Sequence, residues 1–228
     1  TILGGRVNIT AGGDAVKASP DTDDTENPDT TSLGSVTISG GTLTLDAAAD
    51  GIQADGDLTI SGGTFAVTAN GGHTTALSDE DASCKGLKAG KTLTVSGGTF
   101  TVDSADDALH ANDVTVSGGT LTLASGDDAV HADNDLVVGV KGSSSASNPK
   151  IDITASYEGL EGTTVSVYSG DIDVVASDDG VNAANSDLGE HSDKYAINIA
   201  GGDLYIDAGS DGLDSNNDIN ITGGRVEV

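Results

Sequence analysis

Apolar residues recur along this chain in pairs two positions apart, separated by polar residues and by Ser-Gly-Gly turns. The segment 35–55, SVTISGGTLTLDAAADGIQAD, shows the pattern most clearly. Its apolar pairs, Val36/Ile38 and Leu43/Leu45, flank the turn, and a single apolar residue follows within the acidic sequence DGIQ. Alternation with a period of two is typical of a strand with one buried face. Each unit of this kind therefore predicts three short strands.

The unit returns throughout the chain at a spacing of 21 or 22 residues where nothing interrupts it. The second glycine of the turn recurs at Gly41 and Gly63, at Gly98 and Gly119, and at Gly202 and Gly224. Strands this short cannot form separate cores, but stacked units would bury one continuous apolar column. The pattern predicts an all-β fold, a right-handed parallel β-helix that forms a single domain over 1–228. We expect about eight coils of 21–22 residues, with three short strands per coil.

Four stretches interrupt the period, and each falls between predicted strands: 19–33, 70–84, 139–149 and 184–194. The repeat resumes in phase after each one, so we expect loop insertions rather than domain boundaries. Loops that leave a repeat array often form a binding face. Tolerated surface insertions explain each of them as well.

The third apolar segment of each unit carries the candidate chemistry. Its copies are Asp14-Ala15-Val16-Lys17, Asp50-Gly51-Ile52-Gln53, Lys85-Gly86-Leu87-Lys88, Asp107-Ala108-Leu109-His110, Asp128-Ala129-Val130-His131, Glu158-Gly159-Leu160-Glu161, Asp179-Gly180-Val181-Asn182 and Asp211-Gly212-Leu213-Asp214. In stacked units, equivalent carboxylates would form a column with the inter-strand spacing of ~4.8 Å. Two such charges repel by ~1 kcal/mol in water and by more when they are partly desolvated. The column therefore calls for cations.

Calcium fits this column, because it takes about 6–8 oxygen ligands from carboxylates, amides and backbone carbonyls. We expect more than one ion, with the intervening Gly or Ala removing bulk near it. The first predicted cluster consists of Glu158, Glu161, Asp178, Asp179, Asn182, Asp211 and Asp214. The second consists of Asp106, Asp107, Asp127 and Asp128, together with Asp50.

Two other interpretations of the same segment stay open. In the first, the Asp and Asn side chains form a ladder of hydrogen bonds to backbone amides. In the second, His110 and His131, which occupy the same position in neighbouring units, bind a transition metal. No third strong soft ligand is evident nearby, so the sequence favours a surface stack of the two rings. Cys84 is expected to be an inert thiol, because no positioned base accompanies it.

Charge excludes several classes of partner. Lys and Arg number 9 against 37 Asp and Glu, which gives a formal net charge of −28. Nucleic acid and anionic membranes need basic residues, so neither is an expected partner. No stretch approaches ~18 uninterrupted apolar residues, so we expect no membrane insertion. The chain opens inside the repeat without a signal-peptide pattern at Thr1, as expected of a mature fragment whose targeting segment has been removed.

The stacked Asp-Asp-x-x-Asp/Asn triplets resemble the calcium site of family 9 pectate lyases. The whole chain, with its Ser-Gly-Gly-Thr and Asp-Asp-Gly-aliphatic repeats, is similar to a family of secreted bacterial carbohydrate-binding β-helix proteins that bind calcium. That family includes a member that binds cellulose and polygalacturonic acid. The resemblance implies a protein that is secreted or attached to the cell surface. It also implies that Asp178, Asp179 and Asn182 form the central calcium triplet.

The sequence departs from the lyases at the catalytic base. They need a Lys in the coil after the calcium triplet, and here that coil reads Asp211-Gly212-Leu213-Asp214-Ser215-Asn216-Asn217-Asp218. Without a base, calcium alone should give little β-elimination. The leading hypothesis is therefore calcium-dependent, non-catalytic binding of plant cell-wall polysaccharide (polygalacturonic acid or pectin, and cellulose) by a monomer.

The tyrosines are candidate residues for stacking on sugar rings, and two functions other than polysaccharide binding remain as alternatives. The tyrosines, which are candidate ring platforms for sugars, are Tyr157, Tyr168, Tyr195 and Tyr205. The first alternative is a pectate lyase-like enzyme, in which Lys85, Lys88 and Lys91 beside 79–81 and Asp107 supply a base. The second is a structural or ice-binding surface array, because Thr-x-Thr rows recur, as at 42–44, 99–101 and 120–122.

Overall fold

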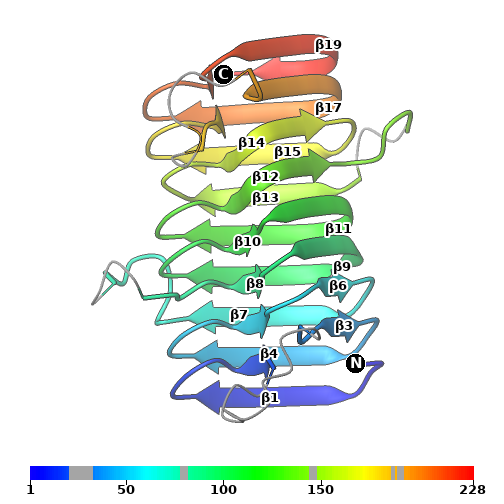
Figure 1. Ribbon diagram of the computed structural model, residues 1–228, viewed down its shortest axis with the longest axis vertical. Helices are drawn as coiled ribbons and strands as arrows, with labels where there is room; N and C mark the ends of the chain where they lie inside the picture. Colours follow the sequence, from blue (N-terminus) through cyan, green and yellow to red (C-terminus); the bar gives the residue numbers. More distant parts are fainter. Residues whose placement is uncertain (21–32, 78–81, 144–147, 186–187, 189–192) are drawn as a thin grey trace.

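The computed structural model describes residues 1–20, 33–77, 82–143, 148–185, 188 and 193–228, and these form a stack of strands that rises from the N-terminal to the C-terminal repeat (Figure 1). The described residues contain no helix, and so none that is long and apolar enough to cross a membrane. The strands in this part of the chain are β1 (Arg6–Ala11), β2 (Val16–Ala18), β3 (Val36–Ile38), β4 (Thr42–Ala47), β5 (Ile52–Ala54), β6 (Leu58–Ile60), β7 (Thr64–Ala69), β8 (Leu87–Ala89), β9 (Thr92–Ser104), β10 (Leu109–Ala111), β11 (Asp113–Ser125), β12 (Val130–Val138), β13 (Lys150–Ala155), β14 (Leu160–Val167), β15 (Asp171–Ala176), β16 (Val181–Ala183), β17 (Ala196–Ala208), β18 (Leu213–Ser215) and β19 (Asp218–Glu227).

Each strand pairs in parallel with its counterpart in the next repeat. Leu109 of β10, for example, is opposite Val130 of β12. The pairing also continues across the predicted insertions, because Val16 of β2 is opposite Ile52 of β5 on the far side of 19–33. The prediction that the repeat resumes in phase is therefore confirmed. Residues 21–32, 78–81, 144–147, 186–187 and 189–192, which fall within the four insertions, lie outside the described residues.

The pairing pattern corrects the predicted fold class. All the named strands belong to a single 19-stranded sheet, and six parallel strands within it close into a barrel, with the others bonded outside that ring. The pairings β11–β12, β12–β14, β14–β17, β17–β15, β15–β13 and β13–β11 complete the ring. The all-β class is confirmed, but the right-handed parallel β-helix with three separate short strands per coil is wrong.

The turn glycines explain this difference. We expected each Ser-Gly-Gly turn to separate two short strands, but β9, β11 and β17 run through the turn as continuous strands of 13 residues each. Gly119 takes a φ of 102°, which only glycine adopts readily, and the register shifts on either side of Gly118 while pairing continues. A single long strand thus includes the apolar pairs on both sides of the turn. This continuity joins the two rows of strands and closes the ring.

The apolar pairs form a continuous core along the stack, as predicted. Leu43, Leu93 and Ile172 are completely buried, and the rings of Phe65 and Phe100 stack with centroids 4.5 Å apart. Burying one such side chain contributes ~1.5–3 kcal/mol. Burial falls off in β19, which pairs with β17 on one side, and its Ile219 and Ile221 are about half exposed. The core fixes the repeat register, and the register positions the acidic segments.

Candidate functional site

The acidic segments of successive repeats stack in register, as the sequence predicted. They lead into the row of short strands that contains β5, β8, β10, the start of β12, the start of β14, β16 and β18. Ala108 N–H donates to Asp128 O at 3.0 Å, and Ala129 N–H donates to Glu158 O at 3.0 Å. The first column of side chains, here called the acidic ladder, consists of Asp14, Asp50, Lys85, Asp107, Asp128, Glu158, Asp179 and Asp211. A second column beside it, on the strands themselves, consists of Lys17, Gln53, Lys88, His110, His131, Glu161, Asn182 and Asp214.

The small residue after each ladder position packs against the core rather than leaving room for an ion. A Cβ added to Gly180 would lie 2.2 Å from Cγ2 of Ile206 and 2.8 Å from the carbonyl oxygen of Gly212. Ala108 and Ala129, at the same position in other repeats, are completely buried. The expectation that Gly or Ala removes bulk near an ion is therefore wrong, because this position faces inward.

Ladder carboxylates bond the backbone of the next repeat. Asp50 Oδ1 accepts a hydrogen bond from Lys85 N–H at 2.8 Å. In the same way, Asp179 Oδ1 accepts from Asp211 N–H at 2.8 Å. The hydrogen-bond ladder that was one of the open interpretations is thus present. It uses one carboxylate oxygen at each of these positions, which leaves the second oxygen for another partner.

Lysine neutralises the N-terminal half of the ladder. Lys85 Nζ lies 2.8 Å from Asp106 Oδ1 and 2.6 Å from Asp107 Oδ2, and both carboxylates are buried. Burial acts against the charge of Lys85, but Asp107 and Asp106 outweigh it and hold the pKa of this ammonium above its usual value. Lys88 donates to Ser83 Oγ, which in turn donates to Asp50 Oδ1 at 2.7 Å. The residues Asp79, Glu80 and Asp81, which the lyase hypothesis placed beside these lysines, lie outside the described residues.

Asp106, Asp107 and Asp127 of the second predicted cluster come together. Their ligand oxygens lie within 4.8 Å of one another. Burial, with the like charges of Asp128 and Asp107, raises the pKa of Asp127 to about 6. This group shares two of its three carboxylates with the Lys85 ammonium. A calcium ion here would compete with that ammonium.

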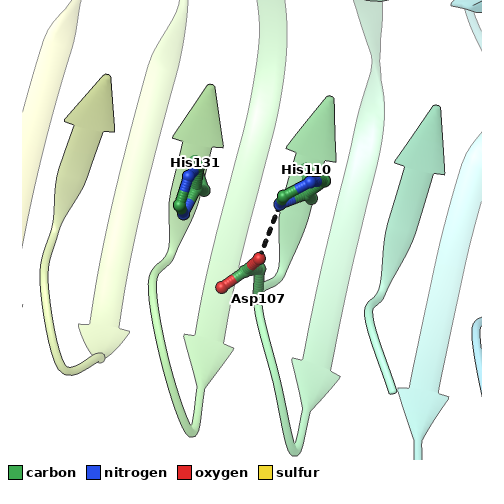
Figure 2. Close-up of side chains that lie close together, drawn as sticks. All are labelled: Asp107, His110 and His131. Carbon is green, nitrogen blue, oxygen red and sulfur yellow. Dashed lines mark hydrogen bonds and ion pairs between the residues drawn. The ribbon is translucent and has the colours of Figure 1, made fainter. Parts of the chain in front are cut away.

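The two histidines lie side by side, as register partners on β10 and β12 (Figure 2). Their ring centroids are 4.9 Å apart. His110 Nδ1 lies 2.8 Å from Asp107 Oδ2, while His131 Nδ1 lies 2.9 Å from Asp128 Oδ2. Each Nδ1 thus bonds the ladder carboxylate three residues earlier. The ligand atoms of Asp107, His110 and His131 lie within 4.8 Å of one another.

His131 has a second carboxylate partner from the next repeat. Its Nδ1 lies 3.0 Å from Glu161 Oε2, so that Asp128, His131 and Glu161 form another group with ligand atoms within 4.8 Å. Burial opposes the charge of His131, but hydrogen bonds to Asp128 and Glu161 raise its pKa to about 11. Burial also raises the pKa of Asp128 to about 8, although its bond with His131 acts in the opposite direction.

The C-terminal half of the ladder has a different balance of charge. Asn182 Nδ2 donates to both oxygens of Glu158, at 2.9 and 2.8 Å. Burial raises the pKa of Glu158 to about 7 in spite of this bond, and burial together with Asp179 raises the pKa of Asp214. Among the ion pairs of the described residues, none involves Glu158 or the four aspartates of the first cluster, Asp178, Asp179, Asp211 and Asp214.

The side chains of the second predicted calcium cluster converge more closely than those of the first. Within the described residues, three groups of acidic or histidine side chains converge within 4.8 Å, and these four aspartates belong to none of them. Asp50 also stays outside these groups and is bonded by the Ser83 hydroxyl. The convergent groups instead centre on Asp107 and His131.

The tyrosines occupy unlike positions. Tyr195 is completely buried and its hydroxyl donates to Asn185 O at 2.7 Å, so its prediction as a sugar platform is wrong. Tyr157 is 47% exposed, and a hydrogen bond with Asp178 raises its pKa to about 12. Tyr168 lies under the ammonium of Lys141, and the Tyr205 ring lies under the Arg225 guanidinium. Three of the four rings thus remain candidates.

A polar groove of about 880 Å³ opens beside the histidine column. His131 and Glu161 contribute to its wall, and the remaining polar lining includes Asp133, Asn134, Thr163 and Asn185. Asn185 Nδ2 donates to Asp133 O at 2.6 Å and to Thr163 Oγ1 at 3.0 Å, which ties three repeats together. Hydroxyl, amide and carboxylate groups on one wall suit a ligand rich in hydroxyl groups.

Comparison with known families matches the whole of this chain. The family is described as "Carbohydrate-binding domain-containing protein", and the match covers residues 1–129 and 130–228. The chain belongs to this family. Carbohydrate binding, which the family resemblance implied, is confirmed at that level, whereas the resemblance to family 9 pectate lyases finds no support in the comparisons. No curated protein and no solved structure matches.

The groove of this carbohydrate-binding chain includes residues that the sequence analysis did not select. Asp133, Thr163 and Thr164 all lie on its wall. Asp133 Oδ1 is 3.6 Å from His131 Nε2, and it follows the signature by only two residues. A polar residue shortly after each acidic segment was the available signal. It was too weak to use, because polar residues are common wherever strands end.

Proposed function

We propose that this protein binds polygalacturonic acid or pectin of plant cell walls through calcium ions, without cleaving the polymer. The observation that carries the proposal is a stacked column of carboxylates in a chain that belongs to a carbohydrate-binding family. An acidic polymer cannot approach a protein of net charge −28 unless cations intervene. Calcium can bridge a carboxylate of the protein to a carboxylate of the sugar.

The C-terminal half of the ladder is the part best suited to calcium. Its residues offer oxygen ligands only, and the register places Glu161, Asn182 and Asp214 in one column. The described ion pairs leave the five carboxylates noted above without a basic partner. Calcium prefers such hard oxygen donors. We propose that the ions are held by Glu158, Asp178, Asp179, Asn182, Asp211 and Asp214.

The ladder of backbone hydrogen bonds is compatible with this role. Asp179 uses Oδ1 to accept from Asp211 N–H, which fixes the carboxylate in place. Its second oxygen is then oriented without further cost in side-chain entropy. Tyr157, which is half exposed and close to Asp178, supplies a ring beside the proposed ions.

A second ligand class, a neutral glucan such as cellulose, is favoured by the groove. Its wall includes Asn134, Asp135 and Thr164, and its volume of about 880 Å³ lies within the usual range for small-ligand sites. Such binding would use hydrogen bonds rather than calcium. The two ligand classes therefore predict different responses to a chelator.

Binding without catalysis is supported by the state of Lys85. A lyase base must be neutral to accept a proton, and Asp107 and Asp106 keep Lys85 charged. Lys88 is bonded to Ser83 and lies 3.8 Å from Asp50. Because plant cell walls lie outside the cell, we further propose that the protein is secreted or held at the cell surface, and acts as a monomer.

The test is retention on insoluble polygalacturonate and on cellulose, each with calcium and with a chelator. We expect chelator to release the protein from polygalacturonate and to leave any cellulose retention unchanged. Asp179→Asn combined with Asp211→Asn should abolish polygalacturonate retention. Asp173→Asn is the matched control, because Asp173 stacks on Asp152 in a different row of strands. Retention on polygalacturonate that persists in chelator would contradict calcium bridging.

A further inference from the structure

The strongest unexplained arrangement in the molecule is the crowding of acceptors around one histidine nitrogen. Asp128 Oδ2 and Glu161 Oε2 lie 2.9 and 3.0 Å from the same Nδ1 of His131. A ring nitrogen carries at most one hydrogen, so it cannot make two well-aligned hydrogen bonds. Two carboxylates and an imidazole nitrogen, which together form a donor set for a metal ion, are thus gathered within 4.8 Å of one another.

The three side chains are held in place by different repeats. Asp128 precedes β12, His131 lies on β12, and Glu161 lies on β14 opposite His131 in the parallel pairing. Asp128 is also fixed by Glu158 N–H, which donates to its Oδ1 at 3.3 Å. The Asp128 side chain is 6% exposed, that of Glu161 17% and that of His131 26%, so the cluster is shielded on one side and open toward the groove.

The distances suit a small ion. Zinc binds nitrogen and carboxylate oxygen at ~2.0–2.2 Å, so neighbouring ligand atoms in a tetrahedral site lie ~3.3 Å apart. The two distances at His131 need to lengthen by only a few tenths of an ångström to meet that value. Because the sheet fixes the backbone, rotation of side chains would suffice.

A second histidine lies beside this cluster in the neighbouring repeat. The ring centroid of His110 is 4.9 Å from that of His131, and Figure 2 shows the two rings on adjacent strands, with Asp107 beneath His110. Ligand atoms of Asp107, His110 and His131 lie within 4.8 Å of one another. His110 Nδ1 is bonded to Asp107 at 2.8 Å, and neither residue belongs to the group of Asp128, His131 and Glu161.

The donor set distinguishes this cluster from the calcium ladder. Imidazole nitrogen suits zinc, copper, nickel and iron, whereas calcium prefers oxygen ligands alone. We propose that Asp128, His131 and Glu161 form a three-ligand binding site for a divalent transition metal of the zinc class. The site stands apart from the proposed calcium sites and does not depend on them.

Its position gives the ion access to whatever occupies the groove. His131 and Glu161 belong to both the cluster and the groove wall. Asp133 Oδ1 lies 3.6 Å from His131 Nε2 and 3.8 Å from His110 Nε2, on the other side of the two rings. These distances are longer than a hydrogen bond, so Asp133 contributes a nearby negative charge rather than a direct bond to either ring.

The experiment is titration of the chelator-treated protein with Zn²⁺ by calorimetry, followed by Co²⁺ titration to record visible absorption. We expect one strong site, absorption bands typical of Co²⁺ with nitrogen ligands, and no displacement by millimolar Ca²⁺. His131→Ala and Glu161→Gln should each weaken Zn²⁺ binding by roughly 10–100-fold or more. Circular dichroism checks that both variants fold.

His73→Ala is the matched control, because His73 Nδ1 also bonds one carboxylate, Asp103, at 2.8 Å. Within the described residues, His73 belongs to no group of three metal-ligating side chains. This variant should bind Zn²⁺ as the parent does. A parent protein that binds no Zn²⁺, or binding that survives both His131→Ala and Glu161→Gln, would overturn the proposal. Neither result would bear on polygalacturonate retention with calcium, so failure of one proposal is separable from failure of the other.

Discussion

Lys85 Nζ lies 2.6 Å from Asp107 Oδ2, in a ladder whose other members are all acidic. The same ammonium contacts Asp106 at 2.8 Å. One lysine thereby offsets two buried carboxylates in the N-terminal half of the stack. Glu158, Asp179 and the later acidic positions have no equivalent lysine among the described ion pairs. This asymmetry divides the ladder into a half whose charge lysine offsets and a half in which we propose that calcium balances the charge.

Lys85→Ala is expected to destabilise the fold by ~3–5 kcal/mol, because removing one member of a buried ion pair leaves the other charged and unpaired. Asp106 and Asp107 have exposed side-chain fractions of only 8% and 2%. Thermal unfolding followed by circular dichroism measures the effect. The variant should also respond more strongly to calcium than the parent does, since two carboxylates become available.

Lys150→Ala provides the matched control for that variant. Lys150 Nζ lies 3.1 Å from Asp171, but both side chains are substantially exposed. Exposed pairs contribute ~0–1 kcal/mol. Equal losses of stability in the two variants would show that the buried pair has no special weight.

The stability of the protein in chelator should fall as the pH rises from about 4 to about 8. The pKa values of Asp127, Glu158 and Asp128 are raised to about 6, 7 and 8 in the folded protein, above their ordinary values of 3.8 and 4.5. A carboxyl group with a raised pKa favours folding while it is protonated, and this contribution is lost as the pH passes through the folded-state pKa. His131, whose pKa is also raised, acts in the same direction over a higher range.

Thermal unfolding at a series of pH values measures this dependence. We expect the unfolding temperature to decrease by roughly several degrees toward pH 8, with the effect limited by solvent screening of the partly exposed groups. Excess calcium should reduce the decrease. An unfolding temperature that rises steadily over the same range would contradict the raised pKa values.

Gly180→Ala tests the packing role of the small residue in the acidic signature. The added Cβ would lie 2.2 Å from Ile206 Cγ2 and 2.8 Å from Gly212 O. Overpacking of this kind costs ~1–3 kcal/mol. Gly12→Ala is the control, since a Cβ at Gly12 meets no atom within 4 Å. Chemical denaturation should show a clear loss of stability for the first variant and little change for the second.

The sequence predicted the stacking well because hydrophobic periodicity and strand register have one physical cause. A slip of one residue would move every buried side chain to the surface, so a pattern such as Val36/Ile38 above Leu58/Ile60 allows a single alignment. The closed ring of strands was missed for a local reason. Whether a strand continues through a Gly-Gly turn, as in β11, depends on hydrogen bonds to both neighbouring repeats, which hydrophobic pattern does not report.

The sequence predicted the position of the candidate site better than it predicted which side chains contact one another there. Register placed the acidic ladder correctly, but side-chain direction decided which groups converge. Glu161 bonds His131 of the preceding repeat rather than the aspartates of its own predicted cluster. Tyr195 could not be recognised as buried, because an aromatic residue just before a strand can pack on either side of the chain.

Calcium titration of polygalacturonate binding tests the proposed function most directly. Affinity electrophoresis of the parent protein through gels that contain polygalacturonate measures retardation at increasing Ca²⁺, with Mg²⁺ as the comparison ion. We expect retardation to appear only with Ca²⁺, to saturate, and to disappear in the Asp179→Asn, Asp211→Asn double variant. Retardation that is equal with Ca²⁺, Mg²⁺ and chelator, or that the double variant retains in full, would contradict a calcium bridge between the acidic ladder and the polymer.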